Sequence, residues 1–192
     1  MKKQLYVAYG SNLNKRQMSY RCPTAKFIGT GVIHDYGLQF KGLYSSSFAT
    51  IAPKKGESVP VAVWEIKPKD ERSLDIYEGY PKHYFKHTVP VEMDGITVRA
   101  MVYVMNLDAT FGVPSAQYYG VVREGYRDCG LDVSVLNKAV ISSLERAASN
   151  QRQSFRLGNS YPKSSRRSYE MPMDDNEEEN LLSESEDGQM YL

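Results

Sequence analysis

Long apolar runs, paired cysteines and an excess of one charge are all missing from this chain of 192 residues. The first apolar stretch extends only from Leu5 to Tyr9, which is too short for the core of a signal peptide or for a membrane span. The sequence therefore predicts a cytoplasmic protein with no membrane partner. With 41% hydrophobic residues, a chain of this length can bury one good core.

The charge is nearly balanced, with a formal net charge of +1. Lysines and arginines are scattered among acids and apolar residues along the chain, whereas nucleic-acid-binding proteins carry clustered basic stripes. Nucleic acid is therefore not an expected partner.

Metal and disulfide patterns are also missing. Cys22 and Cys129 are far apart in sequence and have no CxxC or Cys/His ligand spacing, which favours a reduced setting and two inert thiols. The three histidines, His34, His83 and His87, have no metal-like spacing. The chain also lacks a P-loop, a dinucleotide fingerprint and a Gly-x-Ser-x-Gly elbow, so neither a metal nor another cofactor is expected.

The last part of the chain differs in composition from the rest. Residues 150–192 hold five basic and nine acidic residues, and eight acids with no base fall between Asp174 and Asp187. Because such a segment has few apolar side chains to bury, we expect a disordered acidic tail over 150–192 and one domain over 1–149. Leu181-Leu182 and Met190-Tyr191-Leu192 are candidate docking motifs for a protein partner.

What is present is a series of β-type runs and amphipathic segments. Asp94-Gly95 is a strong hairpin signal, Pro53 and the polar stretch 54–57 are expected to break a strand, and Gly79 and Gly130 are expected to end helices. The predicted strands cover residues 4–9, two runs within 25–40, 48–53, 59–66, 84–93 and 96–105, and the predicted helices cover 14–21, 67–77, 116–129 and 134–148.

Two stretches are candidates for a site. The first strand leads directly into Tyr9-Gly10-Ser11-Asn12, a small-residue loop that can offer backbone N–H groups to a ligand, although such clusters are also ordinary turns. Glu78 lies at a predicted helix end among Tyr77, Tyr80 and Tyr84, where partial desolvation is expected to raise the pKa of its carboxyl. Taken alone, Glu78 competes with surface acids of the same type: Glu65, Glu71, Asp75, Glu92 and Glu124.

Several stretches together and in order resemble the γ-glutamylcyclotransferase family and its AIG2-like relatives. The resemblance covers about residues 4–136. It rests on Tyr-Gly-Ser-Asn-Leu at 9–13, Ala49-Thr50-Ile51, Val63-Trp64, Leu74-Asp75-x-x-Glu78-Gly79, Pro114-Ser115-x-x-Tyr118 and Gly130-Leu131.

The resemblance implies an α+β fold, a small mixed β-barrel with flanking helices. It also implies a reaction without cofactor, in which the α-amine of a γ-glutamyl compound attacks its own γ-carbonyl to give 5-oxoproline and a free amine or amino acid. Glu78 would be the catalytic acid and base, and Tyr84 and Tyr103 would line the pocket. The substrate-binding residues implied are Tyr6, Val7, Ala8, Tyr9, Gly10, Ser11 and Tyr118.

Two other hypotheses stay open at this stage. The second hypothesis is a non-catalytic module of the AIG2-like type, which binds a small acidic ligand or a peptide end in the same pocket. A third hypothesis is transfer of the γ-glutamyl group to an external amine, which requires an acceptor site. Glu78 itself favours the cyclising enzyme, because a pure binder of an anionic ligand has no use for an unpaired carboxyl.

Overall fold

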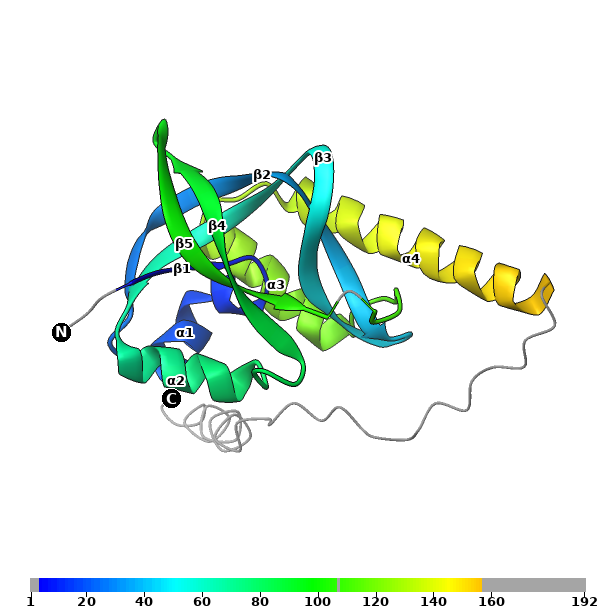
Figure 1. Cartoon of the computed structure of the whole chain (residues 1–192), viewed down its shortest axis with the longest axis horizontal. Coiled ribbons are helices and arrows are strands. Elements are labelled where there is room, and N and C mark those ends of the chain that lie inside the picture. The colour runs from blue at the N-terminus through cyan, green and yellow to red at the C-terminus, as the bar shows by residue number, and fades with distance from the viewer. Residues whose placement is uncertain (1–3, 107, 157–192) are drawn as a thin grey trace, which may run out of the picture. The chain divides into compact units, whose positions relative to one another are not determined.

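A closed five-stranded barrel forms the centre of the computed structural model, which describes residues 4–106 and 108–156. Around the barrel the strands follow the order β1-β3-β2-β4-β5, and they are linked by antiparallel pairing except where β1 runs parallel to β5 at Tyr6 and Met101. The predicted mixed barrel is therefore confirmed (Figure 1). The strands are β1 (Gln4–Ala8), β2 (Lys26–Leu43), β3 (Ser46–Ile66), β4 (Tyr84–Met93) and β5 (Ile96–Met105).

The long β2–β3 hairpin is where the sequence prediction is wrong. The expected breaks at Pro53 and at 54–57 do not occur, and β3 continues through both to Ile66. The extra residues of β3 are taken up opposite Asp35, where the register shifts and φ is 59°. The Asp35 carboxylate accepts a hydrogen bond from the backbone N–H of Gly56 at 2.8 Å. A bulge of this kind absorbs extra residues without ending the ladder.

The β4–β5 hairpin agrees with its prediction at both strands. Asp94 and Gly95 have φ values of 48° and 77°, as a type I′ turn requires of both central residues. Apolar side chains of these strands join those of β1 to β3 in one core, which includes the fully buried Ile33, Phe40, Ile51, Val61 and Val91.

Four α-helices accompany the barrel in the described part of the chain: α1 (Lys15–Arg21), α2 (Pro68–Tyr77), α3 (Ala116–Asp128) and α4 (Val133–Arg156), together with the short 3-10 helix η1 (Ser11–Leu13). In Figure 1, α1 and α2 lie close together at one edge of the barrel, and α4 packs along β2 and then continues past it. The helix expected over 134–148 is longer than predicted, because α4 takes in residues up to Arg156.

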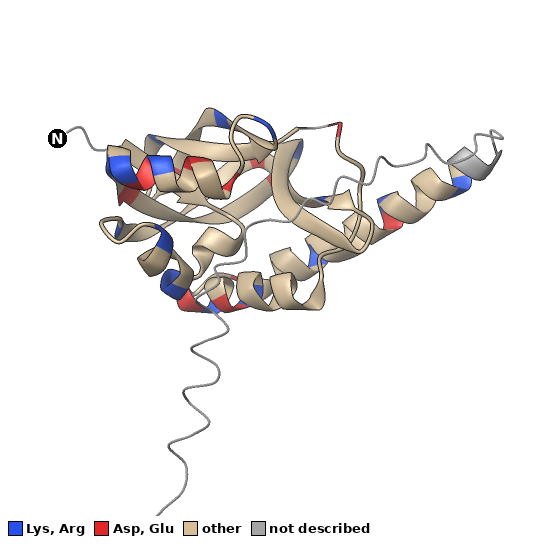
Figure 2. Ribbon diagram, turned by 90° about the horizontal axis from the view of Figure 1, so that it is seen from below, with Lys and Arg blue, Asp and Glu red and all other residues tan. Residues whose placement is uncertain are grey.

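The predicted disordered tail begins at 150, so its first residues belong to α4 and residues 157–192 lie outside the described part. Basic and acidic residues are interspersed along the described helices and strands, as their scattered positions in the sequence predict (Figure 2). No helix among residues 4–106 and 108–156 is both long and apolar enough to span a membrane.

Candidate active site

Glu78 occupies the end of α2, and the local sequence explains why the helix stops there. Pro68 opens the helix, where a missing N–H costs nothing, and the Asp70 carboxylate accepts the backbone N–H of Lys67 at 2.9 Å. At the other end the Glu78 N–H donates to the carbonyl of Leu74 at 2.8 Å. Gly79 then takes a φ of 61°, a conformation that favours glycine, and the chain leaves the helix with Glu78 at its end.

The loop after β1 is the second part of the site. Gly10 follows the strand, and its carbonyl accepts the N–H of Leu13, so residues 11–13 close into η1. A side chain at position 10 has little room, since a Cβ there would lie 3.1 Å from Oη of Tyr118 and 3.3 Å from Cβ of Ala49. Asn14 then caps α1 by accepting the N–H of Gln17 at 3.0 Å.

The fold brings this loop against the end of α2, 66 positions away in sequence. Nδ2 of Asn12 donates to Oε1 of Glu78 at 2.8 Å, and Oγ of Ser11 lies 3.0 Å from Oη of Tyr77. Ser11 and Asn12 are both buried, at 7% and 3% exposure. The two stretches that the sequence singled out are therefore parts of one site.

Tyrosines from several elements surround the Glu78 carboxyl. Tyr9 donates its hydroxyl to the carbonyl of Tyr103 at 2.6 Å, and Tyr84 donates to the carbonyl of Ala49 at 2.9 Å. The hydroxyl of Tyr118 accepts the N–H of Ala49 at 3.2 Å. Because these hydroxyls already have backbone partners, their rings are held in place around the site.

The electrostatics of the site follow from this packing. Burial raises the pKa of Glu78 to about 7, and the positive charge of Arg21 and the hydrogen bond from Asn12 act in the opposite direction. Burial also raises the pKa of Tyr6, Tyr9 and Tyr84 well above their ordinary value, and the Glu78 charge adds to the effect. Near neutral pH the site therefore holds neutral phenols and one carboxyl that exchanges a proton readily.

The predicted substrate-binding residues fall into two groups. Tyr6, Val7 and Ala8 lie within β1 and pair with β3, and Tyr6 reaches the site through its hydroxyl, which accepts a hydrogen bond from Nδ2 of Asn12 at 2.9 Å. Tyr9, Gly10, Ser11 and Tyr118 gather where the loop meets Ala49 and Tyr77. Val7 has no contact that distinguishes it from the buried core.

Two residues at the site were missed by the sequence reasoning, Asn12 and Arg21. Asn12 contacts Glu78 directly, and Nη1 of Arg21 donates to Oδ1 of Asn12 at 2.9 Å. Asn12 belongs to the loop motif, so its amide was a signal within reach. Arg21 had none, because it lies at the end of a short polar helix with nothing local to mark it.

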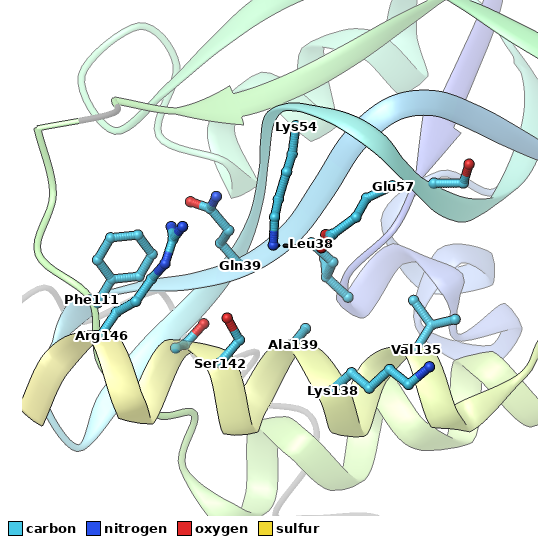
Figure 3. A pocket seen from close by; sticks show the side chains of 12 residues that line it. Leu38, Gln39, Lys54, Glu57, Phe111, Val135, Lys138, Ala139, Ser142 and Arg146 are labelled. Carbon is cyan, nitrogen blue, oxygen red and sulfur yellow. Dashed lines mark ion pairs between the residues drawn. The ribbon is translucent and has the colours of Figure 1, made fainter.

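A groove on another face of the barrel, with a volume of about 320 Å³, offers a comparison. It lies between α4 and the β2–β3 hairpin, and its lining includes Leu38, Phe111 and Arg146 (Figure 3). Glu57 is the carboxylate of this lining, and it is paired with Lys54 at 2.5 Å. The carboxylate of this groove is therefore an ion-paired group, and the groove shares no lining residue with the site at Glu78.

The described residues contain no group of three histidine, cysteine, aspartate or glutamate side chains that could hold a metal ion. Cys22 is buried, and burial raises the pKa of its thiol to about 12, which disfavours the reactive thiolate. Glu78, by contrast, has a pKa near neutral pH, where a carboxyl can both take up and release a proton.

A small mixed barrel with flanking helices, in which a glycine-containing loop lies against the half-buried Glu78 carboxyl, defines the class of fold. The chain belongs to the family of gamma-glutamyl cyclotransferase, AIG2-like proteins, whose model matches residues 6–126. The match spans both the loop and Glu78.

Relatives support this placement. The chain is similar to the gamma-glutamylcyclotransferase of Bos taurus, with 30% identity over 154 residues that cover 73% of this chain and 78% of the relative. It is 29% identical to the Homo sapiens gamma-glutamylcyclotransferase over 146 residues, covering 70% and 76% of the two chains. A solved structure named gamma-glutamyl cyclotransferase superposes with a TM-score of 0.66 at 28% identity, covering 72% of this chain and 86% of the other.

Proposed function

We propose that the chain is an enzyme that releases 5-oxoproline from a γ-glutamyl amino acid or amine by intramolecular cyclisation, with Glu78 as general base and then general acid. The observation that carries the proposal is the pairing of a Glu78 carboxyl, whose pKa is about 7, with the Gly10–Asn12 loop. A base with a pKa near the working pH combines a useful ionised fraction with adequate proton affinity.

The chemistry requires two protons to move from the attacking nitrogen to the leaving nitrogen, because the α-ammonium carries three hydrogens, the ring nitrogen of 5-oxoproline carries one, and the amine departs as an ammonium. An ammonium cannot attack a carbonyl, so Glu78 first takes a proton from the α-ammonium group. The free amine attacks the γ-carbonyl carbon, and the new C–N bond closes the five-membered ring. The bond to the leaving nitrogen then breaks as Glu78 returns the proton to it. The regenerated carboxylate takes the second proton from the ring nitrogen and passes it to the released amine, which departs as an ammonium and leaves Glu78 ionised.

The loop supplies the binding part of the proposal. Gly10 and Ser11 follow the paired part of β1, so their backbone N–H groups are suited to the substrate carboxylate or to the oxygen on which negative charge develops. Tyr118 would contact the glutamyl part, since its hydroxyl lies beside both Ala49 and Gly10. The residues that precede the loop would hold it in position: Tyr6, Val7 and Ala8 in β1, and Tyr9 directly after it.

The test is release of 5-oxoproline, measured by mass spectrometry, from a panel of γ-glutamyl amino acids and amines incubated with the purified full chain. The Glu78→Gln variant should lower the rate by about 10²- to 10⁴-fold while substrate still binds. Glu57→Gln is the matched control, because it makes the same change in the groove of Figure 3 and should leave the rate unchanged.

Two results would contradict the proposal. Turnover by Glu78→Gln at the wild-type rate would show that another group is the base. Saturable binding of γ-glutamyl compounds without product would favour the non-catalytic binding module instead.

A further inference from the structure

The Asn12 side chain is a junction between three groups of the site. Its Nδ2 donates to Oε1 of Glu78 at 2.8 Å and to Oη of Tyr6 at 2.9 Å, and its Oδ1 accepts from Nη1 of Arg21 at 2.9 Å. Asn12 is only 3% exposed, so these partners replace water. Both amide hydrogens and the amide oxygen are thus in use.

The orientation of this amide matters for Glu78. If the amide turned over, Oδ1 would face the Glu78 carboxylate and Nδ2 would face the Arg21 guanidinium, which places acceptor against acceptor and donor against donor. A guanidinium has hydrogen-bond donors only, so Arg21 can bond to the Asn12 amide only when the amide oxygen faces it. Arg21 therefore decides that the donating end of the amide points at Glu78.

Arg21 is itself held in place. It is the last residue of α1, and its guanidinium carbon lies 3.6 Å from the centroid of the Tyr77 ring. The Tyr77 hydroxyl in turn lies 3.0 Å from Oγ of Ser11 in the loop. The planar guanidinium thus stacks on one partner while its edge donates to another, an arrangement that a lysine ammonium cannot reproduce.

We propose that Arg21 is a positioning residue for Glu78, which holds the Asn12 amide in the orientation that stabilises the carboxylate and so keeps the base available between turnovers. This inference rests on the proposed function for its catalytic consequence, but its structural part concerns Arg21, Asn12 and Glu78 alone. None of the sequence motifs pointed to Arg21.

The other groups that face Glu78 do not supply this effect. Burial raises the pKa of five facing tyrosines, so these phenols are neutral at pH 7: Tyr6, Tyr9, Tyr84, Tyr103 and Tyr118. Arg21 is the group whose charge lowers the pKa of Glu78. The titratable groups around the site are Tyr6 and Tyr9 from β1 and its end, Tyr77 from α2, Tyr84 from β4, Tyr103 from β5, Tyr118 from α3 and Arg21 from α1.

Replacing Arg21 tests the inference in two ways. In full-length Arg21→Gln, the acid-side midpoint of the profile of kcat/KM against pH for 5-oxoproline release should move up by about one pH unit. The carboxyl ¹³C resonance of Glu78, followed by NMR through a pH titration without substrate, should shift its midpoint in the same direction. Arg16→Gln is the matched control on an exposed position of α1 and should change neither midpoint.

The NMR titration separates this inference from the proposed function. If the wild-type protein releases no 5-oxoproline, the proposed function fails, yet the titration still reports whether Arg21 acts on Glu78. A folded Arg21→Gln protein with an unchanged Glu78 midpoint overturns the inference. A profile of kcat/KM against pH that is lower at every pH but keeps the wild-type midpoint also overturns the inference. A rise in KM alone overturns it as well, because it would indicate that Arg21 contacts the substrate directly.

Arg21→Lys covers the case in which Arg21→Gln does not fold. It keeps the positive charge but lacks the planar fork, so the midpoint should move in the same direction by a smaller amount. A lysine variant with wild-type titration and wild-type rate would show that charge alone suffices, which contradicts a role through the Asn12 amide.

Discussion

The hydroxyl oxygen of Tyr118 lies 3.1 Å from the point that a Cβ on Gly10 would occupy. The same hydroxyl accepts the N–H of Ala49 at 3.2 Å, so the loop after β1, strand β3 and helix α3 meet at this point. The close approach makes position 10 sensitive to the smallest side chain, and the sensitivity concerns the site more than the core.

Gly10→Ala should therefore impair the site. The added methyl group has to displace the Tyr118 hydroxyl or shift the loop by a few tenths of an ångström, so we expect kcat/KM for γ-glutamyl substrates to fall by about tenfold or more. Gly120→Ala is the control, because a Cβ there meets nothing within 4 Å and the residue lies inside α3. That variant should keep its activity and gain up to about 1 kcal/mol in stability. Equal activity of the two variants would argue against a tight loop.

The pH dependence of the wild-type rate gives a second prediction. Glu78 must be ionised to take the first proton, and its pKa is about 7. We therefore expect kcat/KM to fall tenfold for each pH unit below this midpoint and to level off above it. Stopped assays of 5-oxoproline between pH 5 and 9 measure the profile, and a rate that stays constant down to pH 5 would exclude Glu78 as a base with this pKa.

The raised pKa of Glu78 also predicts a pH-dependent stability difference. In the unfolded chain the carboxyl ionises near its ordinary value of 4.5, whereas in the folded protein it does so near 7. Because the folded state binds the proton more tightly, ionisation destabilises it increasingly as the pH rises from 4.5 to 7. Glu78→Gln lacks this effect, so its stability relative to wild type should rise over this interval by about 1–3 kcal/mol and then stay constant.

Urea unfolding at pH 5, 6, 7 and 8 measures this difference. Glu57→Gln serves as control, since Glu57 is exposed and paired with Lys54. A stability gap between Glu78→Gln and wild type that does not change with pH would refute the raised pKa.

A fourth prediction concerns Asp70, which fixes the start of α2. Its carboxylate is 1% exposed and accepts hydrogen bonds from Oγ1 of Thr24 at 2.7 Å and from the N–H of Lys67 at 2.9 Å. Asp70→Ala leaves these half-buried donors without the Asp70 carboxylate and should lower the free energy of unfolding by about 2–4 kcal/mol.

Asp132→Ala is the matched control for this change. Asp132 also accepts from a backbone N–H at a helix start, that of Ser134 at 2.8 Å, but it is exposed, so we expect a loss of about 1 kcal/mol or less. Chemical denaturation measures the free energy of unfolding of both variants. Similar losses in the two would mean that Asp70 stabilises the protein no more than an exposed helix cap does.

Local signals in the sequence determined much of the fold. Asp94-Gly95 predicts the β4–β5 turn because two consecutive residues with positive φ suit this pair, and Gly79 predicts the end of α2 for a similar reason. The break expected at Pro53 is wrong because a strand boundary also depends on its partner, and Asp35 on β2 accommodates the extra residues of β3.

The candidate site also has one part that was predictable from neighbouring residues and another part that depends on contacts between distant residues. The donor-rich loop, the position of Glu78 at a helix end and the family were all predictable from the sequence, because they depend on residues that are neighbours in the chain. The hydrogen bonds from Asn12 to Glu78 and from Arg21 to Asn12 became visible in the folded chain alone. Barrel closure brings α1, η1 and the end of α2 together across 66 positions, and no local pattern encodes which side chains meet there.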